Sequence, residues 1–193
     1  MYGRKKPGRP RGTGGKKETL NDHQIDLVIQ SIMNANRSTK YRNTVLILFN
    51  YYLGLKAVDL AALKVSDVFD NELILGSLII KEAKIPRMLM LNNQKLREIL
   101  GLYIQDRMNK EGKSFDPNSD LFKSQKSSFS SGTLARLINT IYKDVGFANV
   151  TSHSGKHSFI KNLVTQTQDI SIISKMTGDV EMNARRYLSD DES

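Results

Sequence analysis

The chain has 193 residues, of which 39% are hydrophobic and 25% are charged, a composition ordinary for one soluble globular domain. No apolar run approaches the ~20 residues of a membrane span, no apolar stretch follows the first basic residues as in a secretory signal, and there is no cysteine. These features exclude disulfides, thiolate metal sites and cysteine nucleophiles. They predict an intracellular protein of the cytoplasm or nucleoid, or of the nucleus in a eukaryote.

The net charge of +9 is concentrated at the N-terminus. Residues 1–17 hold seven basic residues and no acidic residue, so the rest of the chain carries a net charge of only +2. The same segment has no apolar residue beyond Met1 and Tyr2. A segment with nothing to bury and many positive charges is predicted to be disordered and to bind phosphate in a salt-sensitive way. We therefore expect a basic tail over residues 1–18 and one folded domain over residues 19–193.

Residues 5–12 of this tail read Lys-Lys-Pro-Gly-Arg-Pro-Arg-Gly and resemble an AT-hook. Pro7 and Pro10 favour an extended chain, and Gly8 lets the backbone approach the groove floor. The arginines suit the enhanced negative potential of the narrow minor groove in A/T-rich DNA. The tail residues expected to bind DNA are Lys5, Lys6, Arg9, Arg11, Lys16 and Lys17. A solvated basic tail or a nuclear-localisation run is the alternative.

The spacing of apolar residues predicts helices at the start of the folded domain. Asn21 and Gln24 form a capping box in front of the first helix. A second helix is expected over residues 41–53, where Gly54 ends it, and a third over residues 58–63.

A β-hairpin is expected next, with strands over residues 73–80 and 88–91 and a charged turn over residues 82–86. Helices follow over residues 96–108 and 132–145. The last forty or so residues are expected to form short helices around Ser158, Ile172 and Ala184. The predicted fold class is therefore mainly α with a small antiparallel β-hairpin or sheet.

Several separated motifs carry residues of types that act in catalysis or in ligand binding. They are a Gly-Leu-Lys turn at 54–56 with Asp59, a His-Ser-Gly-Lys-His box at 153–157, Gly-Asp at 178–179, and Tyr187. In this order and spacing they resemble the boxes of the catalytic domain of tyrosine recombinases, the phage integrase family. The resemblance covers about residues 21–187, and the joint order of the motifs is more specific than any one of them.

The resemblance implies a tyrosine recombinase catalytic-domain fold that acts on double-stranded DNA, as a homo-oligomer or with a partner recombinase. It implies no metal and no cofactor, and only the short tail precedes the domain where relatives carry a core-binding domain. The implied roles are Tyr187 as nucleophile, His153 as acid-base group, Lys81 or Lys84 as general acid, Lys56 and Lys156 as phosphate clamp, Asp59 as bracing acid, and His157 as supporting residue. Arg87 is expected among the residues that bind DNA.

The sequence departs from the family pattern at three of these positions. Lysine stands at 56 and 156, where the family has arginine, and Asp179 stands where histidine or tryptophan is usual. Lysine keeps the charge but loses the planar fork that binds two phosphate oxygens at once. A carboxylate near a charged phosphate opposes catalysis. Strand cleavage is therefore expected to be impaired more than DNA binding.

Two functions remain open at this point. The chain is either a recombinase or integrase that breaks and rejoins DNA through Tyr187, or a catalytically silent relative that binds DNA as an architectural, regulatory or accessory factor. Taken singly, the residues also have plain structural explanations. Tyr187, His153 and His157 are of types that often pack or cap helices, and isolated lysines are usually surface charges.

Overall fold

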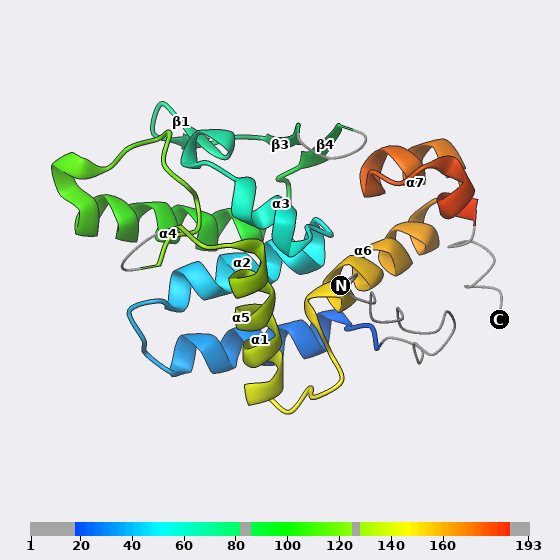
Figure 1. Ribbon diagram of the computed structural model, residues 1–193, viewed down its shortest axis with the longest axis horizontal. Coiled ribbons are helices and arrows are strands. Elements are labelled where there is room, and N and C mark those ends of the chain that lie inside the picture. Colours follow the sequence, from blue (N-terminus) through cyan, green and yellow to red (C-terminus); the bar gives the residue numbers. More distant parts are fainter. Residues whose placement is uncertain (1–17, 82–85, 125–127, 186–193) are drawn as a thin grey trace, which may run out of the picture.

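The structure is a computed structural model that describes residues 18–81, 86–124 and 128–185 (Figure 1). Within these residues the elements run α1 (Asp22–Asn34), α2 (Lys40–Tyr52), α3 (Ala57–Ala62), β1 (Phe69–Asp70), β2 (Leu73–Ile74), β3 (Ser77–Ile80), β4 (Arg87–Met90), α4 (Gln94–Glu111), α5 (Ser131–Asp144), α6 (Ser152–Gln166) and α7 (Ile170–Thr177). Residues 181–185 are also helical. The predicted fold class, mainly α with small antiparallel sheets, is confirmed.

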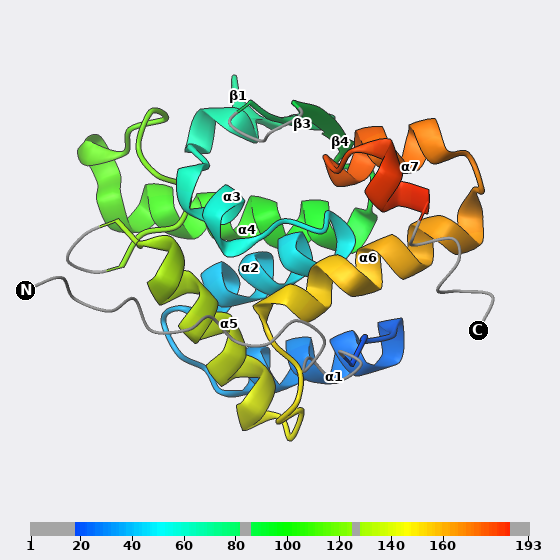
Figure 2. The same ribbon diagram turned by 45° about the vertical axis from the view of Figure 1, so that its right-hand side comes forward.

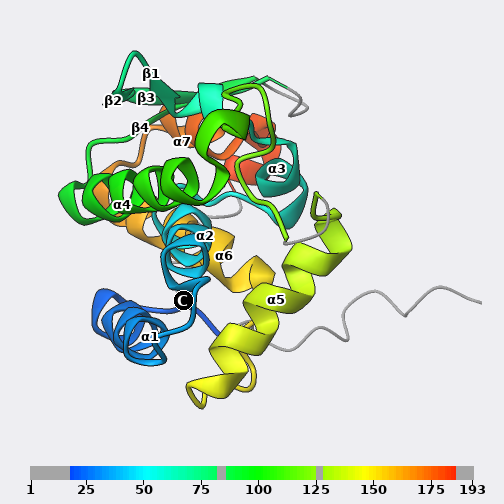
Figure 3. The ribbon, with the colours of Figure 1, turned by 90° about the vertical axis from the view of Figure 1, so that its left-hand side faces the viewer.

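Helix α2 forms the centre of the fold. Every residue from Thr44 to Tyr51 is buried, so this helix is surrounded on all sides. It packs against α1, α4 and α6 (Figure 3). Its C-terminal end leads directly into the turn before α3, and the N-terminal part of α6 lies beside it. The core therefore fixes two of the sequence motifs relative to each other.

The helix starts follow from side-chain capping. The predicted capping box of α1 is present, since Asn21 accepts a hydrogen bond from the Gln24 amide and Gln24 accepts one from the Asn21 amide. At α6, the Thr151 side chain accepts from the His153 amide at 3.3 Å, and Ser154 Oγ accepts from the Thr151 amide at 3.1 Å. Local capping therefore fixes where the His-Ser-Gly-Lys-His box begins its helix.

The predicted strand over residues 73–80 is wrong in one respect, because it divides into two strands. β2 pairs with β1 around a turn at Asn71 and Glu72, which both have positive φ, and β3 pairs with β4 as the expected hairpin. Arg97 on α4 stabilises the break, since its guanidinium donates to the carbonyls of Ile74 at 3.0 Å and Leu75 at 2.9 Å. This contact comes from a distant helix, so local sequence could not reveal it.

Three of the predicted features lie outside the described residues: the AT-hook-like tail, Lys84 in the hairpin turn, and Tyr187. Within the part that is described, no helix combines the length and the apolar character needed to cross a membrane.

Candidate phosphate-binding site

Lys56 stands at the start of α3, in a turn that the core holds rigidly. Gly54 has φ +60°, and a β-carbon at this position would lie 2.5 Å from the ring of Phe159 on α6. Only glycine fits both the backbone conformation and this close approach. The Lys56 amide donates to Asp59 Oδ2 at 2.9 Å. The Gly-Leu-Lys motif is therefore a fixed turn packed against α6, and it places Lys56 at the N-terminal end of α3.

Asp59 forms a buried ion pair with Arg87. Arg87 Nη2 lies 2.8 Å from Asp59 Oδ2, and the two side chains are only 2% and 11% exposed. Arg87 Nη1 also donates to the carbonyl of Thr177 at the end of α7, at 2.9 Å. Burial lowers the pKa of Arg87, and the charge of Asp59 opposes this effect. Together with the Thr177 contact, the ion pair thus joins α3, β4 and α7.

Arg87, which the sequence analysis expects among the residues that bind DNA, is largely buried in the structure. Its Nη1 and Nη2 donate to the Thr177 carbonyl and to Asp59, while its Nε is buried and has no hydrogen-bond partner among the described residues. Its side chain is 2% exposed and also lines the cavity described below, so its contact with DNA stays a prediction. The alternating pattern of β4 explains the burial, because Arg87 and Leu89 are buried while Met88 and Met90 point outward.

Lys156 lies on α6 and is also buried, with 8% of its surface exposed. Its Nζ lies 2.6 Å from Asp179 Oδ2, just after the end of α7. Burial lowers the pKa of Lys156, Asp179 raises it, and the charge of Lys56 lowers it further. Lys56 and Lys156, the two lysines predicted to clamp a phosphate, are therefore close enough to interact, although 100 residues of sequence separate them.

Asn50 connects the first two motifs by hydrogen bonds, and the sequence did not predict this connection. Its side-chain amide donates to the Leu55 carbonyl at 2.8 Å and to the Ser152 carbonyl at 2.9 Å, and its Oδ1 accepts from Tyr142 at 3.3 Å. These two carbonyls directly precede Lys56 and His153. Asn50 thus ties the first motif to the second. The signal in the sequence was a polar residue within the apolar helix α2.

Residues of α3, of the β3–β4 hairpin and of the end of α7 line a cavity of about 480 Å³. Figure 2 shows α3, β3, β4 and α7 together in the upper part of the molecule. Its charged lining residues are Lys56, Asp59, Lys64, Asp67, Lys81, Arg87 and Asp179. Lys81 is exposed at the end of β3, so its amine is available to a molecule in the cavity. The apolar residues of the lining include Val58, Ile79 and Val180. The lining thus holds four basic and three acidic side chains beside apolar ones, and its lysine amines suit an anionic group such as a phosphate.

The structure brings together Lys56, Asp59, Lys81 and Asp179 as lining residues of this cavity, and Lys156 joins them through Asp179. His153 is exposed in the first turn of α6, one turn before Lys156, and His157 is partly buried next to it. Among the described residues, no group of three or more histidines, aspartates and glutamates could hold a metal ion.

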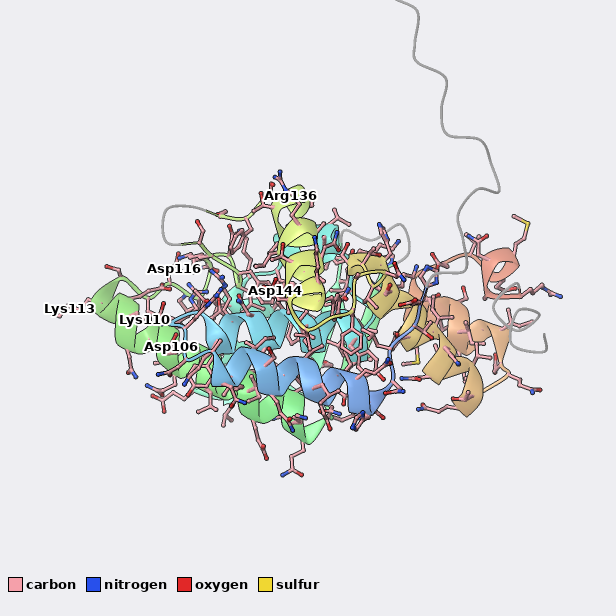
Figure 4. The ribbon with its side chains drawn as sticks, turned by 90° about the horizontal axis from the view of Figure 1, so that it is seen from below. Asp106, Lys110, Lys113, Asp116, Arg136 and Asp144 are labelled. Atoms are coloured by element: carbon pink, nitrogen blue, oxygen red, sulfur yellow. The ribbon has the colours of Figure 1, made fainter. Side chains whose placement is uncertain are left out.

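Other charged groups of the surface lie away from the cavity. Lys110 on α4 pairs with Asp106 at 2.6 Å and donates to the Ser38 carbonyl at 2.8 Å. Figure 4 shows Lys110 and Lys113 at the end of the molecule opposite α7. Lys110 and Lys113 therefore form a positively charged surface that is remote from the candidate site.

Comparisons with known proteins agree with the fold. The model of the phage integrase family matches residues 19–193. The chain is similar to the crystal structure of XerA recombinase, with a TM-score of 0.70 and 22% identity over 95% of this chain and 61% of that one. XerH site-specific recombinase in a post-cleavage complex with palindromic difH substrate gives a TM-score of 0.70 and 22% identity over 94% and 52%.

A lambda integrase dimer bound to a COC′ core site gives a TM-score of 0.64 and 15% identity over 93% of this chain and 50% of that one. At these identities the similarity shows the fold. The chain spans about half to three-fifths of the length of these three relatives. No curated protein matches the chain in sequence.

Proposed function

The chain belongs to the phage integrase family, and from this premise we propose that it binds duplex DNA for site-specific recombination, with a backbone phosphate in the cavity. One observation carries the proposal: Lys56, Lys81 and the Lys156–Asp179 pair converge there from three distant parts of the chain. Lysines bind phosphate well as point charges. The similar XerH and lambda integrase structures hold their recombination sites, which supports the same class of partner.

The proposed reaction is a transesterification at phosphorus. The Tyr187 oxygen forms a bond to the scissile phosphorus, and the bond to the 5′-oxygen of the next nucleotide breaks. Lys81 or Lys84 gives a proton to this leaving oxygen, and His153 accepts the proton of the Tyr187 hydroxyl. Lys56 and Lys156 stabilise the charge on the non-bridging oxygens. Attack by a 5′-hydroxyl on the phosphotyrosine reverses these steps and rejoins the strand.

A second candidate is a catalytically silent DNA-binding relative. The observation that favours it is the Lys156–Asp179 ion pair, because a carboxylate holds one of the two clamp lysines. A silent protein would still bind DNA through its remaining positive charges, as an architectural, regulatory or accessory factor.

A duplex with a nick near the cleavage point distinguishes the two functions. The nick releases a short fragment after cleavage and so traps a covalent intermediate. The wild-type chain should form a protein–DNA adduct that resists denaturing electrophoresis, and Tyr187→Phe should lose it entirely because phenylalanine has no oxygen nucleophile. Tyr187→Phe should keep its DNA affinity within about twofold, since one hydroxyl contributes little to phosphate binding.

A double variant with arginine at positions 56 and 156 tests the alternative, a catalytically silent relative. If the wild-type chain forms no adduct but the double variant Lys56→Arg and Lys156→Arg does, the native chain is a silent relative. An adduct that persists in Tyr187→Phe would contradict the proposed nucleophile.

The tail is part of the same proposal. Residues 1–17 would lie in a neighbouring minor groove, with a preference for A/T-rich sequence, and so strengthen the hold on the duplex. The chain would act as a homo-oligomer on DNA or with a partner recombinase, inside the cell.

A further inference from the structure

Asp179 is held in place by hydrogen bonds to residues of α7. Gly178 ends the helix with φ +68°, and the next amide, that of Asp179, donates to Thr177 Oγ1 at 3.2 Å. Ser174 Oγ donates to the Asp179 carbonyl at 2.7 Å. With its backbone anchored on both sides, Asp179 directs its carboxylate at the Lys156 amine. The ion pair is therefore built by the end of α7.

The Asp179 carboxylate resembles, in its charge and its oxygen acceptors, the phosphate that is expected to bind at Lys156. Lys156 and Asp179 are 10% and 17% exposed, so water screens them weakly. Lys56 lies close enough to disfavour the charge of Lys156, and Asp179 compensates for this repulsion. A phosphodiester carries the same single negative charge and also offers oxygen acceptors. Asp179 thus supplies what a DNA phosphate would supply at Lys156.

We propose that Asp179 is an internal competitor of the DNA phosphate for Lys156. In the free protein it holds the Lys156 amine and balances the two lysines. When DNA binds, the phosphate must take the place of the carboxylate, and the broken ion pair weakens the binding. Asp179 is then a positioning residue that sets the affinity and salt sensitivity of the site. This inference rests on the proposed function, since it requires a phosphate in the cavity.

A double-mutant cycle on DNA binding tests the proposal in the full chain. Dissociation constants for one duplex oligonucleotide are measured over a series of salt concentrations. Asp179→Asn keeps the shape of the side chain but removes its charge, and it should tighten binding about tenfold. The plot of log affinity against log salt should steepen by about 0.9, because no displaced carboxylate then remains to take up a cation when the phosphate binds.

Two further variants separate competition from a general charge effect. In a Lys156→Met background, Asp179→Asn should change the affinity less than twofold, because the competition has been removed. Glu181→Gln is the matched control, since it removes the same charge from an exposed residue two positions away. Asp179→Ser repeats the test if the asparagine variant does not fold.

The outcomes separate the inference from the proposed function. If the wild-type chain binds DNA but Asp179→Asn binds no tighter than Glu181→Gln, the inference fails while DNA binding stands. The same follows if Asp179→Asn gains equally with and without Lys156. If neither the wild type nor any variant binds DNA, the proposed function fails and the inference fails with it.

Discussion

Gly155→Ala should destabilise the protein by about 3 kcal/mol or more, a large part of the stability of a typical domain. A β-carbon at Gly155 would lie 2.1 Å from Asn50 Oδ1 and 2.6 Å from the Asn50 carbonyl oxygen. Either α6 moves away from α2, or Asn50 gives up its hydrogen bonds to Leu55 and Ser152. Overpacking costs about 1–3 kcal/mol, and leaving buried polar groups unpaired costs about 1–3 kcal/mol. Urea unfolding followed by circular dichroism measures the loss.

Gly101→Ala is the matched control for this prediction. Gly101 lies within α4, and no atom lies within 4 Å of its added β-carbon. Because alanine favours helix over glycine by about 1 kcal/mol, this variant should be as stable as the wild type or more so. Equal stability of Gly155→Ala and Gly101→Ala would contradict the close packing of α6 on Asn50.

Asp59→Ala should destabilise the protein by about 3–5 kcal/mol, because it leaves the guanidinium of Arg87 buried without its partner. The Arg87 side chain is 2% exposed, so water cannot replace the lost carboxylate. The Lys56 amide loses its acceptor as well. The same unfolding measurement applies, and DNA binding should fall together with stability because α3, β4 and α7 all border the cavity.

An exposed ion pair provides the contrast. Lys110 and Asp106 are paired at 2.6 Å, but their side chains are 51% and 26% exposed (Figure 4). Asp106→Ala should therefore cost about 0.5 kcal/mol or less. The double variant Asp59→Ala with Arg87→Met should recover much of the lost stability, because it removes the unpaired charge. A loss of under 1 kcal/mol for Asp59→Ala, with no recovery in the double variant, would show that Arg87 is not confined as described.

Local sequence signals predicted most of the elements. Asn21 and Gln24 mark the start of α1 by their mutual hydrogen bonds, and Gly54 marks the end of α2 by its positive φ. Each of these signals depends on residues within a few positions of one another. The order of the motifs also predicted that Lys56, Asp59 and Asp179 belong to one site, and the cavity brings them together.

Contacts between distant residues were not predictable in the same way. The burial of Arg87 depends on Asp59 and on the end of α7, which lie 28 and about 90 residues away. The role of Asn50 depends on carbonyls that only the packing of α6 on α2 brings near. The Lys156–Asp179 contact likewise joins α6 to the residues that follow α7. A single sequence records the residues of such contacts but not their pairing.

The proposed function places one DNA phosphate in the cavity between α3, the hairpin and α7. An experimental structure of the full chain on an A/T-rich duplex tests this directly. We expect non-bridging phosphate oxygens about 3 Å from the amines of Lys56 and Lys156, with the tail in a neighbouring minor groove. A duplex lying instead along the remote surface of Lys110 and Lys113, with no phosphate in the cavity, would show that the phosphate binds elsewhere.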